Sequence, residues 1–233
     1  MKNWILNNSY NIYRVLYGRS NSYLICTDSG NILVDTGRKS KRTLLLKTLQ
    51  KLHIEKIDWL ILTHTHFDHC ENAALLQKKF SCKIVVSDKG YPMAERGYAI
   101  LPCGTNPFTK AISQLGNRFF LRLFYYQRFI PDHTYDEFFS FSIPGIDIEL
   151  ITTPGHSDDS ISIIVNNEIA LVGDAMFGIY KNSVFPPFAD NAVEMVESWG
   201  KLLDTECHTF LPGHGSEIKR ELVEREQVKY SRK

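Results

Sequence analysis

One seven-residue stretch, residues 63–69, constrains the fold of this chain more than any other part of the sequence. It reads Thr-His-Thr-His-Phe-Asp-His and directly follows a largely apolar run, residues 58–62, that predicts a buried β-strand. Three more histidine or aspartate residues also follow apolar runs, and each has a glycine beside it. Together these positions supply seven candidate metal ligands: His64, His66, Asp68, His69, His156, Asp174 and His214. We therefore expect a fold in which several strand ends meet at one point.

The spacing of the first four candidate ligands allows two neighbouring cations. Alternate residues of an extended segment point to the same side, so His64 and His66 can reach one ion. Asp68 and His69 lie further along the chain and can face a second ion. Because imidazole and carboxylate groups bind zinc, iron and manganese, we predict two Zn²⁺ ions, with Fe or Mn as alternatives. The opposing interpretation, seven unrelated structural residues, must explain each strand-end position separately.

The remaining apolar pattern predicts two similar halves that each combine strands with helices. In the first half, strands are expected at 12–15, 22–27, 32–34, 58–62 and 83–87, and helices at 40–52 and 70–80. In the second half, strands are expected at 148–152, 161–165 and 169–172, and helices at 191–204 and 217–230. This order favours an α/β (α+β) architecture, a single domain over residues 1–233 in which helices cover two stacked sheets.

Residues 91–141 do not fit this pattern of strands and helices, because they hold 13 of the chain's 25 Phe and Tyr residues. Part of the segment has apolar residues at helical spacing, and Pro131 ends that run. The spaced residues are Ile112, Leu115, Phe119 and Leu123. We predict a helical insertion with three overlapping uses: a hairpin packed on the core, a lid or pocket wall over the metal site, or a contact that forms a homodimer.

Composition excludes several classes of protein. The chain has 27 basic and 26 acidic residues, so bulk charge gives no support for binding to nucleic acid or to a membrane, although a local basic patch stays compatible with this balance. No apolar run approaches the roughly 20 residues of a membrane span, and the N-terminus lacks the apolar region of a secretory signal. The five cysteines are an odd number without a Cys-x-x-Cys motif, which favours reduced thiols and a cytoplasmic location.

The ligand motifs, taken in order, resemble those of the metallo-β-lactamase fold superfamily, including its glyoxalase II-like and lactonase-like metallo-hydrolases. The match runs from about residue 12 to residue 215 and includes Asp35, at the end of an early strand. The resemblance implies a four-layer αββα sandwich with the site at one edge, between the sheets. In that family, the carboxylate at the position of Asp35 steadies the ligand loop. An ordinary turn aspartate is the alternative.

The resemblance also implies how the ligands are shared. His64, His66 and His156 would bind the first metal, and Asp174 would bridge both metals. The second metal would be bound by Asp68, His69 and His214.

The expected activity follows from this ligand set. The resemblance implies a dinuclear hydrolase in which a metal-bridging hydroxide attacks a small ester, thioester or lactone, and in which Asp68 also carries a proton as a catalytic group. The expected partner is therefore a small-molecule substrate. Three alternatives stay open: a phosphodiesterase of the same fold, a sulfur dioxygenase with one iron, and a non-catalytic metal-binding sensor.

Departures from the family patterns narrow the substrate. Position 174 is Asp rather than the Cys of a common β-lactamase subclass, and 19 residues follow His214 where glyoxalase II-like thioesterases add a glutathione-binding helical domain. Acyl-homoserine lactonases carry Tyr three residues after the bridging Asp, where this chain has Phe177. In the following loop, Tyr180 and Lys181 are predicted substrate contacts, one for an oxyanion and the other for a carboxylate or phosphate. Ordinary surface roles are the alternative for both.

Overall fold

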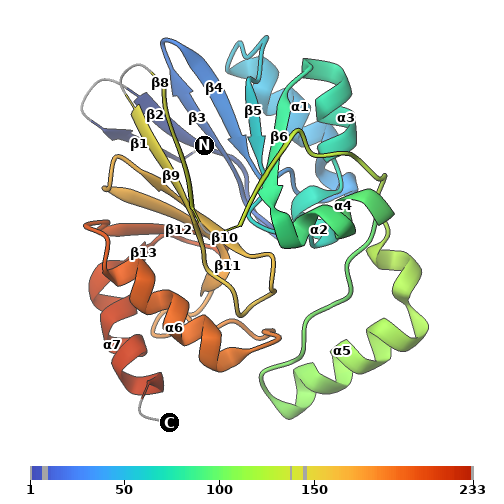
Figure 1. Ribbon diagram of the computed structural model, residues 1–233, viewed down its shortest axis with the longest axis vertical. Coiled ribbons are helices and arrows are strands. Elements are labelled where there is room, and N and C mark those ends of the chain that lie inside the picture. The colour runs from blue at the N-terminus through green and yellow to red at the C-terminus, as the bar shows by residue number, and fades with distance from the viewer. Residues whose placement is uncertain (1, 7–9, 137, 144–145, 232–233) are drawn as a thin grey trace.

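Two β-sheets pack face to face, and helices cover the outer face of each (Figure 1). The computed structural model describes residues 2–6, 10–136, 138–143 and 146–231. The four layers follow the order helix, sheet, sheet, helix, so the expected αββα sandwich is confirmed. Of the helices in the described ranges, none has the length and apolar character needed to cross a bilayer.

The first sheet has seven strands in the order β1-β2-β3-β4-β5-β6-β7. The first four form an antiparallel meander, whereas β4 to β7 run parallel. The parallel pairs need crossover connections, and helices α1 and α3 supply two of them. The bounds are β1 (Asn3–Leu6), β2 (Tyr10–Leu16), β3 (Ser22–Thr27), β4 (Gly30–Val34), η1 (Lys39–Lys41), α1 (Arg42–Lys51), β5 (Trp59–Ile61), α2 (Phe67–Cys70), α3 (Ala73–Phe80), β6 (Lys83–Ser87), η2 (Asp88–Gly90) and β7 (His133–Tyr135).

The second sheet has six strands in the order β13-β12-β11-β10-β9-β8. β11 and β12 run parallel, and the other neighbouring pairs are antiparallel. Helices α6 and α7 cover its outer face. The bounds are β8 (Phe138–Ile143), β9 (Ile146–Thr152), β10 (Ile161–Val165), β11 (Ile169–Gly178), α6 (Ala192–Leu203), β12 (Thr209–Gly215), β13 (Ile218–Lys219) and α7 (Arg220–Tyr230).

Three apolar layers hold the sandwich together, and strand alternation assigns each side chain to its layer. In β3, Ile25 points into the layer between the sheets, while its neighbour Leu24 points toward α1 and α3. Trp199 of α6 is fully buried against the second sheet, in the third layer. Each sheet is therefore apolar on both faces, which leaves the strand ends as the places where polar side chains can gather.

Most expected elements are present, and several features were missed. β1, β7, β8 and β12 were not predicted, and the strand expected at 169–172 continues to Gly178 as β11. The helix expected at 70–80 begins only at Ala73 as α3, after the separate short helix α2. The expected helix at 217–230 begins only at Arg220, because Ile218 pairs with Phe210 and makes a short strand. A two-residue edge strand leaves no periodicity to detect.

The aromatic segment departs from its prediction in two ways. It contains α4 (Tyr91–Arg96), α5 (Pro107–Phe119) and the single turn η3 (Leu121–Phe124), but its last part forms β7 and β8, so helices do not extend to residue 141. Glu137 lies outside the described residues. The four spaced apolar side chains are exposed, so they do not pack a hairpin on the core: Ile112, Leu115, Phe119 and Leu123.

Candidate metal centre

The loop that follows β5 is held by Asp35, which comes at the end of β4. Its carboxylate accepts hydrogen bonds from the backbone N–H of Thr63 and from the hydroxyl of Thr63, both at 2.8 Å, and it lies 2.8 Å from Nδ1 of His69. The backbone of Asp35 is left-handed, with φ of 56°, a conformation that aspartate tolerates better than most residues. Asp35 thus contacts the ligand loop at two points, as the resemblance implied.

Sequence reasoning missed a second buried carboxylate on the same loop. Asp159 accepts hydrogen bonds from the backbone N–H of Thr65 at 2.8 Å and from the hydroxyl of Thr65 at 2.7 Å. Asp35 and Asp159 therefore hold the two threonines that alternate with His64 and His66. The signal was present as His-Ser-Asp-Asp-Ser after the glycine of the next motif, but nothing in it separates the buried aspartate from its exposed neighbour.

The other three candidate ligands come from the second sheet. His156 follows β9, where Gly155 has φ of 124°, and its Nδ1 lies 2.9 Å from the carbonyl oxygen of Phe188. That carbonyl can only accept, so Nδ1 carries the proton and Nε2 offers a lone pair. Asp174 and His214 lie on the paired strands β11 and β12, and their side chains approach within 3.1 Å.

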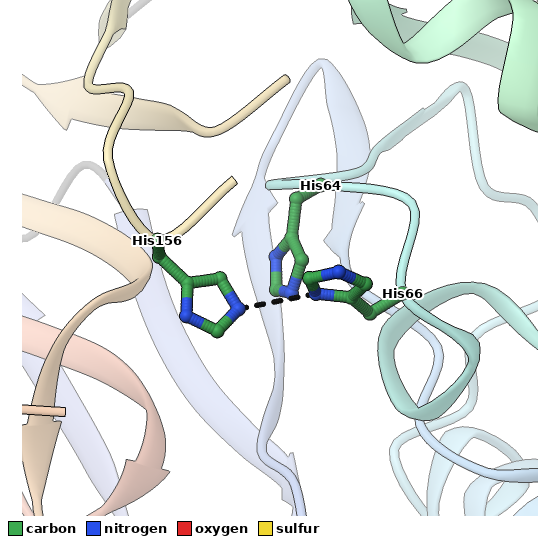
Figure 2. A group of neighbouring side chains, drawn as sticks. All are labelled: His64, His66 and His156. Carbon is green, nitrogen blue, oxygen red and sulfur yellow. Dashed lines mark hydrogen bonds between the residues drawn. The ribbon is translucent and has the colours of Figure 1, made fainter. Parts of the chain in front are cut away.

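Three imidazoles converge from the two sides of the site (Figure 2). Nδ1 of His66 lies 3.1 Å from Nε2 of His156, and Nε2 of His64 is buried without a hydrogen-bond partner in the described part of the chain. Burial lowers the pKa of all three groups, to about 4 for His156, so they are neutral at neutral pH. Neutral imidazoles with converging lone pairs suit a divalent cation.

A second group adjoins the first. Nε2 of His214 lies 3.1 Å from Asp174 and 3.5 Å from Asp68, and Nε2 of His69 lies 3.4 Å from Asp174. Burial lowers the pKa of His69 and His214, but the surrounding aspartates together, Asp174 first among them, outweigh burial and hold both pKa values above the usual range. Burial raises the pKa of Asp174, and the two histidines outweigh it and hold that pKa well below its usual range.

Three further observations show that the residues present fit divalent cations. One oxygen of Asp174, Oδ1, is buried without a hydrogen-bond partner among the described residues, although a carboxylate oxygen normally has one, and its contact with Nε2 of His69 is a long one at 3.4 Å. Gly213 leaves this oxygen room, because a Cβ there would lie 2.3 Å from Oδ1 of Asp174 and 2.6 Å from Cε1 of His69. The ligand atoms of each three-residue group lie within 4.8 Å of one another.

The structure gives less support to the predicted substrate contacts than to the candidate metal ligands. Phe177 is buried, and its ring packs on His214 with centroids 4.6 Å apart. Tyr180 and Lys181 are both exposed and stay predictions. Cys70 is buried in the layer under α3, and its thiol donates to the carbonyl oxygen of Thr65.

Comparison with known proteins decides the family. A model of the metallo-β-lactamase superfamily matches residues 16–214, most of the chain. The chain belongs to this superfamily. The predicted resemblance is therefore confirmed, and the expectation of a metallo-hydrolase is supported at the level of the superfamily.

Two curated relatives carry functional names. A protein of Methanocaldococcus jannaschii called "Probable metallo-hydrolase" is 29% identical over 201 residues, which cover 84% of this chain and 87% of that protein. An atrochrysone carboxyl ACP thioesterase of Aspergillus fumigatus is 24% identical over 202 residues, covering 86% of this chain. The chain spans about half of that thioesterase, 52% of its length.

Solved structures of the superfamily share the fold. A metallo-β-lactamase superfamily protein of Sulfolobus tokodaii superposes with a TM-score of 0.68 at 18% identity, over 94% of this chain and 85% of that one. A subclass B3 metallo-β-lactamase of Bradyrhizobium japonicum gives 0.71 at 19% identity, over 97% and 90%. At these identities the likeness concerns the fold alone.

Proposed function

We propose that this chain is a hydrolase that uses two divalent cations, zinc in the first place, to cleave a small ester, thioester or lactone. The observation that supports this most strongly is the convergence of seven ligand side chains in two adjoining groups. Three of them come from the second sheet and four from the loop and helix α2 after β5. An isolated structural ion would need only one such group.

The first group, His64, His66 and His156, would hold one cation, and Asp68, His69 and His214 would hold the other. Asp174 would join the two, because its oxygens approach ligands of both groups: His156 at 3.6 Å and His214 at 3.1 Å. Two bound cations supply a Lewis acid for the substrate oxygen and lower the pKa of water toward neutrality.

The chain's own residues orient these parts and handle protons. Asp68 is the more open carboxylate of the cluster, with its side chain 20% exposed against 5% for Asp174. It can therefore take the proton that the attacking water releases and pass it to the leaving group, through the carboxylate oxygen that would not bind the cation. Asp35 and Asp159 keep the loop in one conformation, so the ligands need no rearrangement when the substrate binds.

An apolar wall beside Asp68 favours an acyl substrate. The rings of Phe67, the residue before Asp68, and Phe124 of η3 lie 5.4 Å apart. Arg38 lies over the ring of Phe67, 4.7 Å from its centroid, and offers a cation for a substrate carboxylate. The thioesterase among the relatives supports a thioester within this class.

The test is hydrolysis of a panel of acyl thioesters, esters and lactones by the metal-loaded protein. We expect turnover that a chelator abolishes and that Asp68→Asn lowers by about 10²-fold or more, the range for removal of a general acid. Asp132→Asn is the matched control, because Asp132 is an exposed aspartate outside the cluster.

Three outcomes would contradict the proposal. Oxygen consumption on a persulfide by a one-iron protein would assign the sulfur dioxygenase, and cleavage of phosphodiesters alone would assign the phosphodiesterase. A fully loaded protein without turnover on any class would assign the metal-binding sensor.

A further inference from the structure

Helix α5 turns its apolar side toward solvent, the reverse of a normal surface helix. Phe108, Ile112, Leu115 and Phe119 recur at helical spacing along one stripe, and they are 74%, 40%, 54% and 64% exposed. Leu123 of η3 extends the stripe and is 63% exposed. Contiguous exposed apolar side chains of this kind mark an interaction site in a soluble protein.

The inverted orientation is fixed by polar contacts on the inner side of the helix. The side chain of Asn117 accepts from the N–H of Leu101 and donates to its carbonyl oxygen, both at 2.9 Å. Thr109 and Ser113 are the buried residues of the helix. Gly116 lets the helix approach Phe124, whose ring would lie 3.3 Å from a Cβ at that position. The hydrogen bonds between Asn117 and Leu101 hold this side of the helix inward. Rotation of α5 that buried the apolar stripe would break these hydrogen bonds.

The segment is attached at both ends to residues beside the metal cluster. Before α5, Gly104 pairs with Phe188, the residue whose carbonyl oxygen contacts His156. After α5, Phe124 packs on Phe67, next to Asp68. Figure 1 shows α5 standing away from the two sheets at the edge of the molecule. A surface that holds the stripe of α5 would therefore lie close to the cluster.

Charge indicates what this surface is. Residues 97–131 contain four basic side chains and no aspartate or glutamate. All four are exposed: Lys110, Arg118, Arg122 and Arg128. A symmetric contact between two copies would place this basic segment against itself, at a cost in repulsion. An anionic lipid surface instead receives the apolar side chains and attracts the cations.

We infer that α5 and η3 form a docking surface for an anionic membrane. Phe108, Leu115, Phe119 and Leu123 enter the boundary between headgroups and acyl chains, and Arg118 and Arg122 contact the phosphates. This surface changes the sequence-based expectation of no membrane partner, which rested on bulk charge rather than on the charge of one face. It does not depend on the chain being a hydrolase.

The test is sedimentation with vesicles of phosphatidylcholine alone or of equal parts phosphatidylcholine and phosphatidylglycerol. We expect binding to the anionic vesicles that falls with added salt and is weak for the neutral ones. Leu115→Ser with Phe119→Ser lowers the partition coefficient by about tenfold or more. Arg118→Gln with Arg122→Gln lowers it by about fivefold for each charge.

Matched controls on α1 distinguish binding through this surface from non-specific binding of exposed apolar or basic side chains to vesicles. Leu44→Ser removes a leucine of similar exposure, 48% against 54% for Leu115, and Lys47→Gln with Lys51→Gln removes two exposed cations of another helix. These controls keep the binding of the unaltered chain. The His66→Ala variant also keeps it, and a loss of hydrolysis with binding intact would leave this inference standing.

Three results would overturn the inference. One is a lack of binding to either kind of vesicle. Another is a loss of vesicle binding in the α1 controls as large as the loss in the α5 and η3 variants. The third is a dimer in sedimentation equilibrium that Leu115→Ser with Phe119→Ser converts to a monomer, which would assign the stripe to a second copy of the chain.

Discussion

At the scale of single residues, the cluster depends on groups that hold its ligands as much as on the ligands. Asp35 contacts Nδ1 of His69, and the carbonyl oxygen of Phe188 contacts Nδ1 of His156. In each case the outer contact fixes which ring nitrogen faces the cluster, which is the role such partners have around bound metals. Asp159 acts one step further out, through the backbone of the loop.

Removal of the Asp159 carboxylate tests this supporting role. Asp159→Ala leaves the N–H and hydroxyl of Thr65 buried without an acceptor, so we expect the free energy of unfolding to fall by about 2–4 kcal/mol. Metal affinity should fall about 10- to 100-fold. Denaturant unfolding and equilibrium dialysis measure the two effects. Asp158→Ala, at the exposed neighbouring aspartate, should change neither, and equal effects of both substitutions would contradict this role.

The space above Asp174 gives a second prediction. In Gly213→Ala the new methyl group overlaps Oδ1 of Asp174 and the ring of His69, so we expect an affinity loss of about tenfold or more and a cost of about 1–3 kcal/mol. Gly200→Ala on α6 is the control, because its nearest neighbouring atom lies 3.9 Å away. It should raise stability by about 0.5–1 kcal/mol, and unchanged metal binding in Gly213→Ala would refute the packing argument.

The candidate ligands could be picked out from the sequence, because their spacing is local and their motifs are specific. The supporting residues were less so. Asp159 is identical in type to Asp158, and only the fold shows which of them is buried. The orientation of Tyr180 and Lys181 likewise depends on a loop whose course no local pattern determines.

At the scale of elements, the candidate site forms where the ends of β4, β5 and β9 meet an irregular stretch of β11 and the last residues of β12. β4 and β5 run parallel, so Asp35 and the histidine loop leave the same edge, and β11 and β12 bring Asp174 and His214 together in the same way. Apolar runs predicted β4, β5 and the first part of β11, but they did not predict β12. They could not predict β7 and β8, because the aromatic residues there suit a buried helix as well as a strand.

The two ligand groups should respond differently to pH. His69 and His214 have raised pKa values without metal, so each keeps its proton below that pKa and must lose it when a cation binds. Affinity of the second group therefore falls as pH drops below those pKa values, by about tenfold per unit for each displaced proton. The first group has lowered pKa values and meets no such competition until more acidic pH.

On acidification from mildly basic pH, we thus expect one cation to leave well before the other. Elemental analysis after equilibrium dialysis at a series of pH values measures the stoichiometry. Loss of both cations in one step would contradict this order. So would a His66→Ala variant that keeps the cation of the first group and loses the cation of the second group.

At the scale of the whole molecule, the cluster links the two halves of the sandwich. Four candidate ligands belong to the half of the sandwich that contains the first sheet: His64, His66, Asp68 and His69. The other three come from the second sheet. The αββα order was predictable from the alternation of strands and helices together with the resemblance. The exposure of the apolar stripe of α5 was not predictable. Helical spacing shows that one face is apolar, but it does not show that polar contacts with Leu101 turn the opposite face inward.

The most direct test of a two-cation centre is the number of divalent cations bound per chain, counted by native mass spectrometry after reloading with zinc at neutral pH. We expect two in the unaltered chain and two in His208→Ala, which removes an exposed histidine outside the cluster. We expect loss of metal in His66→Ala. A carefully loaded chain that holds no cation, or a His66→Ala variant that still holds two, would contradict a two-cation centre.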